Sequence, residues 1–315
     1  MKRILRAGLA ALAMAATATA SLADWNPPGP IKMLIGFRAG GGADTQARLI
    51  AEALEDRLGW KIIPEQVTGK GGLNLAAALR DAPSDGTVIG LAVTETLGYN
   101  MAAANTDMTP SDFTGIATTA GFQMGIVALS TKGWTDFNDV IAAAKAGEQI
   151  RFGAMSPKLA DLAYLLGKAN GVAFNIVVVR GGKAVMDGVT AGDLDLGFMA
   201  GIQNKGVIAG DLVNLASALS VPLALSPDAP TLSDLGVPFN ADGYFVFIAP
   251  AGLPEEARAA LSAAIADVVT DESTKAHAFI SRAFGAPTVI SGGDLSQMLA
   301  RDYDGATELL DASAE

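Results

Sequence analysis

The sequence has no cysteine and only one histidine, His277, among its 315 residues. Without cysteine, disulfide bonds, thiol nucleophiles, thiolate metal sites and iron–sulfur clusters are excluded. One histidine excludes the H-E-x-x-H zinc motif, and no nucleophile motif lies near His277 to complete a serine triad. Nucleotide motifs are also incomplete, because Thr45 replaces the last glycine of the dinucleotide fingerprint and Pro64 the first glycine of a Walker A loop. We therefore expect no catalytic residue, no metal site and no cofactor.

Basic residues are scarce, since 22 Lys and Arg against 33 Asp and Glu give a net charge of −11. Nucleic-acid binding needs clustered Lys and Arg to neutralise phosphates, so a nucleic acid is not an expected partner. Hydrophobic residues make up 50% of the chain and charged residues only 17%. This composition excludes a disordered chain, because it can bury enough apolar surface to offset the entropy of ordering.

The N-terminus has the pattern of a secretory signal peptide. Three of the first six residues are basic, residues 7–20 are uncharged and apolar, and the small residues Ser21 and Ala23 frame a cleavage site. The apolar run is too short to cross a hydrocarbon core of ~30 Å. We therefore expect residues 1–23 to be removed after Ala23 and the mature chain to be periplasmic. It is not expected to be a lipoprotein, which would need a cysteine at the cleavage point.

Apolar runs of strand length alternate with helical patterns through the rest of the chain, which predicts α/β layers around mostly parallel sheets. Thr135 is the expected N-cap of one of the helices. Strands are expected at 31–37, 61–64, 87–93, 124–129, 151–154, 174–179, 193–199, 212–218 and 244–249, and helices at 43–58, 73–80, 135–146, 159–169, 182–191, 255–270 and 273–284.

The number of expected strands favours two lobes over one sheet, because cores tend to split near this chain length. No single linker separates the halves, so we expect the chain to cross between the lobes more than once, near 120–124 and 241–245. The predicted organisation is lobe 1 at 24–121, lobe 2 at 122–242, and a return to lobe 1 with C-terminal helices at 243–315.

Three glycine clusters, at 40–42, 71–72 and 181–182, lie between an expected strand and an expected helix. In α/β sheets, ligands bind beyond the carboxyl ends of strands. Glycine lets the backbone approach a ligand, and the N–H groups of a helix N-terminus favour an anion. Arg38 lies beside the first cluster and Arg180 directly before the third. Two such loops from opposite halves suit a ligand with two separated carboxylates.

These segments resemble the solute-binding receptors of tripartite tricarboxylate transporters, also called Bug receptors. Residues 31–44 resemble the family's opening, a strand followed by [FY]-P-A-G-G-G-x-D, and residues 47–54 match its A-R-x-[IL]-A-x-x-L helix. Further motifs follow in the family's order, so the resemblance extends over essentially the whole chain after residue 23. These further motifs lie at 67–74, 82–86, 179–182, 191–198 and 247–254.

The resemblance implies a type II-like periplasmic binding protein, with two lobes, a mostly parallel sheet flanked by helices in each, and a ligand cleft between them. It further implies a monomeric receptor that performs no chemistry. Such a receptor closes on a small di- or tricarboxylate or related organic acid and delivers it to the integral-membrane permease of the transporter. Two alternatives stay open at this point, a periplasmic hydrolase and a ligand-sensing partner of a signalling receptor, each using the same cleft.

Carried over position by position, the resemblance implies that the first glycine loop and a strand end hold one carboxylate, while the other lobe holds the far end of the ligand. Arg38 stands where the family usually has proline, so it adds a cation that favours a more highly charged ligand, and Glu95 adds an opposing carboxylate at the same rim. The expected ligand contacts are Phe37, Arg38, Ala39, Gly40, Gly41, Asp44 and Thr94 from lobe 1, and Ser156, Arg180 and Gly181 from lobe 2.

Overall fold

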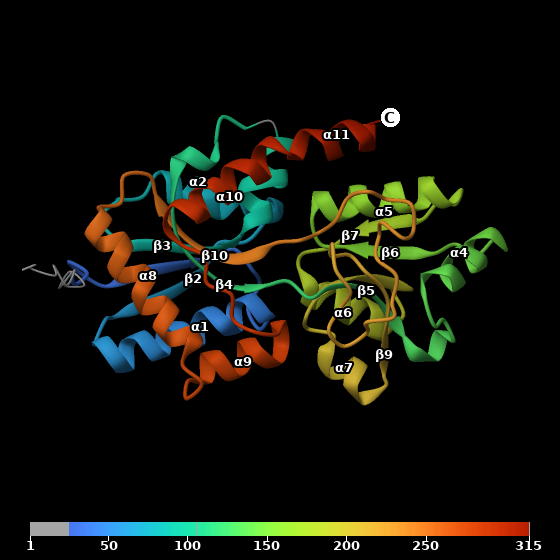
Figure 1. Ribbon diagram of the computed structural model, residues 1–315, viewed down its shortest axis with the longest axis horizontal. Coiled ribbons are helices and arrows are strands. Elements are labelled where there is room, and N and C mark those ends of the chain that lie inside the picture. The colour runs from blue at the N-terminus through green and yellow to red at the C-terminus, as the bar shows by residue number, and fades with distance from the viewer. Residues whose placement is uncertain (1–24, 105, 315) are drawn as a thin grey trace, which may run out of the picture.

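The computed structural model describes residues 25–104 and 106–314. In this part of the chain, ten strands form two five-stranded sheets, each flanked by helices, and the two α/β lobes lie side by side along the longest axis (Figure 1). The expected fold class is therefore confirmed. The expected signal peptide at 1–23 lies outside the described residues, so it and the cleavage site stay predictions.

The first sheet has the strand order β2-β1-β3-β10-β4. Strand β1 pairs in parallel with β2 and β3, whereas β10 runs antiparallel to β3 and β4. Its strands are β1 (Ile31–Ile35), β2 (Ile62–Gln66), β3 (Val88–Val93), β4 (Phe113–Gly121) and β10 (Tyr244–Pro250). The accompanying helices are α1 (Gly42–Leu58), α2 (Leu73–Arg80), α3 (Met101–Ala103), α8 (Glu255–Thr270), α9 (Lys275–Phe284), α10 (Gly292–Asp304) and the turns η1 (Lys70–Gly72), η2 (Thr96–Asn100) and η3 (Pro110–Asp112).

The second sheet repeats this plan in the order β7-β6-β8-β5-β9. Strand β6 pairs in parallel with β7 and β8, and β5 runs antiparallel to β8 and β9. Each sheet is thus mixed, with four strands in one direction and one reversed. The elements are β5 (Met124–Leu129), η4 (Ser130–Lys132), α4 (Phe137–Lys145), β6 (Arg151–Ala154), α5 (Pro157–Asn170), β7 (Asn175–Val178), α6 (Gly182–Ala191), β8 (Leu196–Ala200), α7 (Asn204–Ala209) and β9 (Leu212–Ser217).

The first strand and the first helix form where the apolar pattern predicts them, and a glycine marks the end of the helix. Residues Ile31, Met33 and Ile35 of β1 are fully buried, as expected for a strand covered by helices on both faces. Helix α1 buries one apolar stripe and ends at Gly59, whose φ of 68° is the left-handed conformation that favours glycine at a helix C-terminus. The local sequence therefore determines where helix α1 ends and which of its sides packs against the sheet.

Several details differ from expectation, among them one helix cap, one strand start and one whole strand. Helix α4 is capped by Asp136, not Thr135, because the Asp136 carboxylate accepts a hydrogen bond from Asn138 N at 2.6 Å. Strand β8 begins at Leu196 rather than at 193. Strand β4 was not expected at all, since small residues dominate it; they are needed because a Cβ at Gly115 would lie 2.8 Å from Leu295 of α10.

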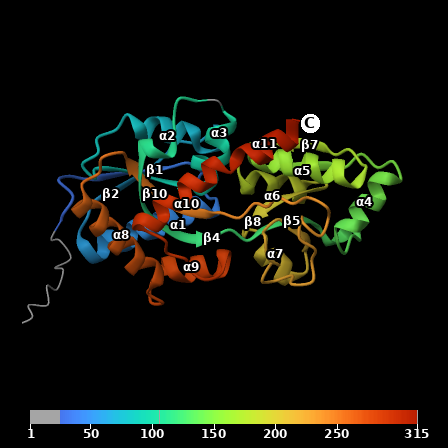
Figure 2. The ribbon, with the colours of Figure 1, turned by 45° about the horizontal axis from the view of Figure 1, so that its top comes forward.

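The chain passes from the first sheet to the second between β4 and β5, and returns between β9 and β10. At this crossing Phe122 N donates to Gly243 O at 2.9 Å. The expected lobe boundaries stay a prediction. Helix α11 (Ala306–Ala314) then extends from the first lobe and lies against α5 of the second (Figures 1 and 2). Among the described residues, no helix combines the length and the apolar character needed to cross a bilayer.

Candidate ligand-binding site

A cavity of about 410 Å³ lies between the two lobes. The first lobe contributes the loop after β1, the turn before α2 and part of β10, and the second contributes the loops before α5 and α6. The volume lies within the range of small-molecule sites in proteins. Because both lobes line the cavity, one small molecule can contact both at once.

Four helix N-termini meet at this cavity, two from each lobe. Helices α1, α2 and α6 begin after Gly41, Gly72 and Gly181, and none of these caps has a side chain that could accept from the first turn. Helix α5 is capped by Ser156, whose Oγ accepts from Leu159 N at 3.3 Å. The first N–H groups of three helices are therefore free of side-chain caps, and the positive ends of their dipoles favour an anion here.

Two of these caps require glycine for different reasons. Gly72 has a φ of 95°, and a Cβ there would collide with Thr96 Oγ1 of the adjacent η2 turn. Gly181 has a φ of 85° but open space around it, so only its backbone conformation excludes other residues. Each lobe thus exposes the main chain of a glycine to the cavity, with no side chain in the way.

The charged side chains lining the cavity are mostly basic. Arg38 and Lys70 come from the first lobe, Arg180 and Lys183 from the second, and Glu95 is the one acidic residue of the lining. Lys183 forms an ion pair with Asp187 at 2.9 Å, whereas Arg38, Lys70 and Arg180 make no ion pair with any residue the structure describes. Three cations that form no ion pair within the described part of the chain thus line a site with four helix N-termini, so a multiply charged anion suits it electrostatically.

Lys70 also has an unusual backbone. Its φ of 50° makes it the one non-glycine residue with a positive φ among those described. A non-glycine residue is seldom found in this conformation, and such positions concentrate at functional sites. The turn of residues 69–72 therefore presents a cation and a helix N-terminus to the same cavity.

Phenylalanine rings form much of the remaining wall. Phe245 of β10 contacts Phe37, Phe122 and Phe284, with ring centroids 6.3, 5.2 and 4.6 Å away. All four rings line the cavity, although they come from four separate segments of the chain. The site is therefore cationic at its loops and hydrocarbon along this wall.

A comparison with known proteins identifies the family. Residues 46–282 match the family model of the tripartite tricarboxylate transporter family receptor, TctC. The chain belongs to this receptor family. The matched range begins just after the first glycine loop, so the resemblance of residues 31–44 adds to it independently.

Related proteins agree with this assignment of the receptor. BugT of Bordetella pertussis is 28% identical over 261 residues, which cover 76% of this chain and 76% of BugT. The R. palustris protein Rpa4515, solved with adipate, is 20% identical, with a TM-score of 0.81 over 92% of this chain and 99% of its own. MatC from Rhodopseudomonas palustris, solved with bound malate, is 20% identical, with a TM-score of 0.77 over 90% and 100%. These structures share the receptor's two-lobed fold.

Six of the ten expected contact residues line the receptor's cavity, and four do not. Ala39 and Gly40 lie in the first glycine loop but outside the lining. Asp44 is 3% exposed, and its carboxylate accepts from Gly40 N and Arg48 Nε, each at 2.9 Å. The six that line the cavity are Phe37, Arg38, Gly41, Ser156, Arg180 and Gly181.

Thr94, the fourth residue outside the lining, is also engaged within the protein. Its Oγ1 accepts from Tyr244 N at 3.1 Å, and it lines a second cavity of about 380 Å³ that opens toward α10 and α11. Asp44 and Thr94 thus hydrogen-bond within the protein beside the site, and their direct contact with a ligand stays a prediction.

Several lining residues were not among the expected contacts. Lys70 had a detectable signal, because it lies within the second glycine cluster that already suggested an anion site. Lys183 follows the third cluster directly. No local motif could have found Phe122, Phe245 and Phe284, because the folded chain brings them together from distant segments.

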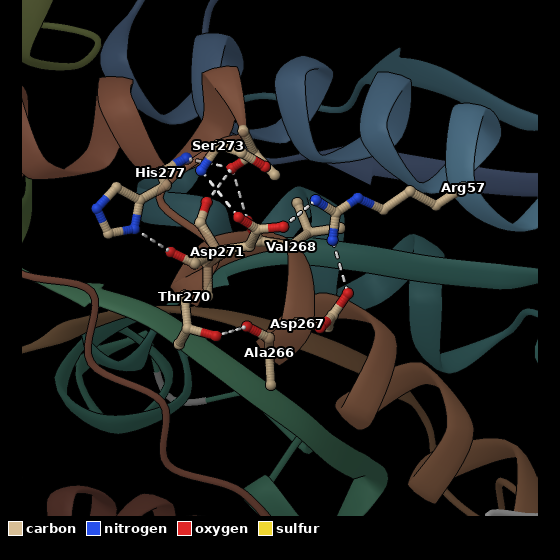
Figure 3. Close-up of polar contacts among 10 residues, drawn as sticks. Arg57, Ala266, Asp267, Val268, Thr270, Asp271, Ser273 and His277 are labelled. Carbon is tan, nitrogen blue, oxygen red and sulfur yellow. Dashed lines mark hydrogen bonds and ion pairs between the residues drawn. The ribbon is translucent and has the colours of Figure 1, made fainter.

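The single histidine lies elsewhere on the receptor (Figure 3). His277 is on α9, with Nδ1 2.9 Å from Val269 O and Nε2 3.1 Å from Ser281 Oγ. Beside it, Arg57 of α1 forms ion pairs with Asp267 and Asp271 near the end of α8 (Figure 3). None of these residues lines the interlobe cavity. No cluster of three or more potential metal-ligating side chains occurs in the part of the chain that the structure describes.

Proposed function

We propose that this receptor captures a small organic anion with two carboxylates in the interlobe cavity and delivers it, in the periplasm, to the membrane permease of a tripartite tricarboxylate transporter. The observation that carries the proposal is the meeting, on one cavity, of four helix N-termini and three cations that form no ion pair with the described residues, from both lobes. Backbone N–H groups and guanidinium groups both bind carboxylates well.

Because each lobe contributes cations to the cavity, we expect the lobes to close on the ligand. A ligand that bridges Arg38 of one lobe and Arg180 of the other makes its full set of contacts only when the lobes are together, so it stabilises the closed arrangement. The lobes also touch directly where Asn204 Nδ2 of α7 donates to Ala283 O of α9 at 3.1 Å. The net charge of −11 would repel an anion at long range, so the local cations must provide the attraction.

The ligands named for two structural relatives, adipate and malate, are both dicarboxylates and support this ligand class. The first test is a thermal-shift screen of the mature chain against mono-, di- and tricarboxylates. A ligand at ~100 times its Kd adds about 2.7 kcal/mol to the free energy of unfolding, which gives a clear shift in Tm. No shift with any di- or tricarboxylate would contradict the proposal.

Arginine variants then locate the binding site. Arg38→Ala and Arg180→Ala should each weaken dicarboxylate binding by about 1.5 kcal/mol or more, because each removes a charge-assisted hydrogen bond. Arg282→Ala is the matched control, since Arg282 is on α9 but outside the cavity lining. Calorimetry should show unchanged affinity for the control. If Arg38→Ala and Arg180→Ala bound the dicarboxylate as tightly as the Arg282→Ala control, the ligand would have to bind outside this cavity.

The same screen separates the receptor from a hydrolase. A receptor returns its ligand unchanged, whereas a hydrolase consumes it. Among the residues described, Ser281 and His277 form a serine–histidine contact, and both lie outside the interlobe cavity. Chromatography of the bound compound after prolonged incubation should therefore recover it intact, and conversion to product would contradict the receptor assignment.

A further inference from the structure

The lining of the interlobe cavity combines its cationic loops with a wall of hydrocarbon side chains. Phe245 is 4% exposed and stands at the centre of the phenylalanine wall, with Phe284 and Phe122 buried to a similar extent. Phe37 is half-buried and completes the wall on the side of the first glycine loop. Met124 and Met155 extend it toward the second lobe. A ligand held by cations of both lobes shares the cavity with this wall.

The cavity offers few partners for hydroxyl groups. Its uncharged polar side chains are Thr68, Asn100 and Ser156. Ser156 Oγ accepts from Leu159 N in capping α5 and keeps its hydroxyl hydrogen as a donor, while Asn100 Nδ2 donates to Gly71 O at 3.0 Å and to Glu95 at 3.2 Å. Apart from the backbone N–H groups and the cations that would hold the carboxylates, this leaves the hydroxyls of Thr68 and Ser156, the Glu95 carboxylate and the buried Asn100 Oδ1, which has no hydrogen-bond partner among the described residues. A heavily hydroxylated ligand would therefore bury unpaired hydroxyls, which is unfavourable.

We propose that the receptor selects dicarboxylates with a plain hydrocarbon body, aliphatic or aromatic, over hydroxylated diacids of the same length. This inference rests on the proposed function, because it assumes that two carboxylates occupy the two cationic ends. The phenylalanine wall provides the selectivity, because its rings stabilise a bound hydrocarbon chain by apolar contact and offer no hydrogen bond to a hydroxyl group.

The test compares each plain diacid with the sugar diacid of equal length, by calorimetry on the full mature chain. The pairs are succinate with tartrate, glutarate with xylarate, and adipate with galactarate. We expect galactarate, with four hydroxyls, to bind at least about tenfold more weakly than adipate, and the difference to grow with the number of hydroxyls along the series. Equal or tighter binding of the hydroxylated diacids would overturn the inference while leaving the proposed function intact. No binding of any diacid would overturn both.

A variant pair tests whether the wall is the cause. Phe37→Gln puts a hydrogen-bonding group into the wall, so it should weaken adipate binding and narrow the adipate-to-galactarate ratio. Phe174→Gln is the matched control, because Phe174 is also half-buried but packs on Phe137 and Phe152 within the second lobe, at 5.9 and 5.5 Å. Its ratio should equal that of the wild type, with folding checked by circular dichroism. An unchanged ratio in a folded Phe37→Gln variant would contradict the role of the wall.

Discussion

Replacing Asp195 with asparagine should remove a charge on which the second lobe depends. Asp195 is 6% exposed and lies at the start of β8. Its carboxylate accepts from Arg151 N at 2.9 Å, from Arg151 Nε and Nη2 at 3.0 Å each, and from Lys132 Nζ at 2.5 Å. The carboxylate thus holds together β6, β8 and the η4 turn after β5, which makes it the main electrostatic link in this lobe.

The expected loss is about 2 kcal/mol in the free energy of unfolding. A hydrogen bond to a charged group contributes about 1.5–3 kcal/mol, and the variant would weaken three side-chain bonds of this kind. The total is discounted because the side chains of Arg151 and Lys132 are 40% and 35% exposed, so solvent screens both ion pairs. Asparagine also retains an oxygen that can accept from Arg151 N. In a protein of this size the loss should lower Tm by about 3 °C.

The pH dependence gives a sharper test. Burial disfavours the charged form of Asp195, but the hydrogen bonds from Arg151 and Lys132 outweigh it and hold the pKa of this carboxyl well below its usual range. A depressed pKa contributes stability that is complete above the unfolded pKa of about 3.9 and is lost as the pH falls toward the folded value. The stability difference between wild type and Asp195→Asn should therefore be full at pH 7 and shrink below about pH 4.

Chemical denaturation of both proteins across this pH range measures the difference directly. Asp193→Asn is the matched control, because Asp193 is exposed and forms no ion pair with the described residues. It should unfold at nearly the same denaturant concentration as the wild type at pH 7. A difference for Asp195→Asn that is absent at pH 7, or that persists unchanged into strong acid, would refute the reasoning.

Two further predictions concern the lobe contact and the glycine turn. Tyr99→Phe removes the hydrogen bond from the Tyr99 hydroxyl to Asp161 across the lobes and should cost about 1.5 kcal/mol in denaturation experiments. Burial and Asp161 raise the pKa of Tyr99, so this cost should be full below the unfolded pKa of about 10 and should decline only above it. A cost that vanishes by pH 9 would contradict this account. Gly72→Ala should lower the free energy of unfolding by about 2 kcal/mol, because it forces alanine into a positive φ and against Thr96. Gly181→Ala, strained but unobstructed, should cost less; equal costs would show that the contact with Thr96 is unimportant.

The sequence predicted elements best where glycine and proline bound a clear apolar pattern. Helix α8 (Glu255–Thr270) begins directly after Pro254 and agrees with expectation at both ends. Strand β4 (Phe113–Gly121) lacks such a pattern, because glycine and alanine occupy four of its nine positions and let α8 and α10 pack closely on it. This strand could therefore not be predicted from its own sequence, because the helices that pack on it come from distant parts of the chain.

The residues of the candidate site likewise fall into those that local sequence predicts and those that only the folded chain reveals. The glycine loops at Gly41 and Gly181 could be found from sequence, because strand ends, glycine and helix starts are local features. Asp44 was predicted as a ligand contact for the same reason, but only the structure shows that its carboxylate accepts a hydrogen bond from Gly40 N. The phenylalanine wall needed the tertiary structure, since Phe122 and Phe284 reach the cavity from the interlobe crossing and the end of α9.

The central claim is that one dicarboxylate bridges the two lobes. Small-angle scattering of the mature chain, alone and saturated with the tightest-binding dicarboxylate of the thermal-shift screen, tests it most directly. The account predicts a smaller radius of gyration with the dicarboxylate, and little change with its monoamide, which lacks the second charge. Identical curves for the free and the dicarboxylate-saturated protein would contradict closure on a bridging ligand.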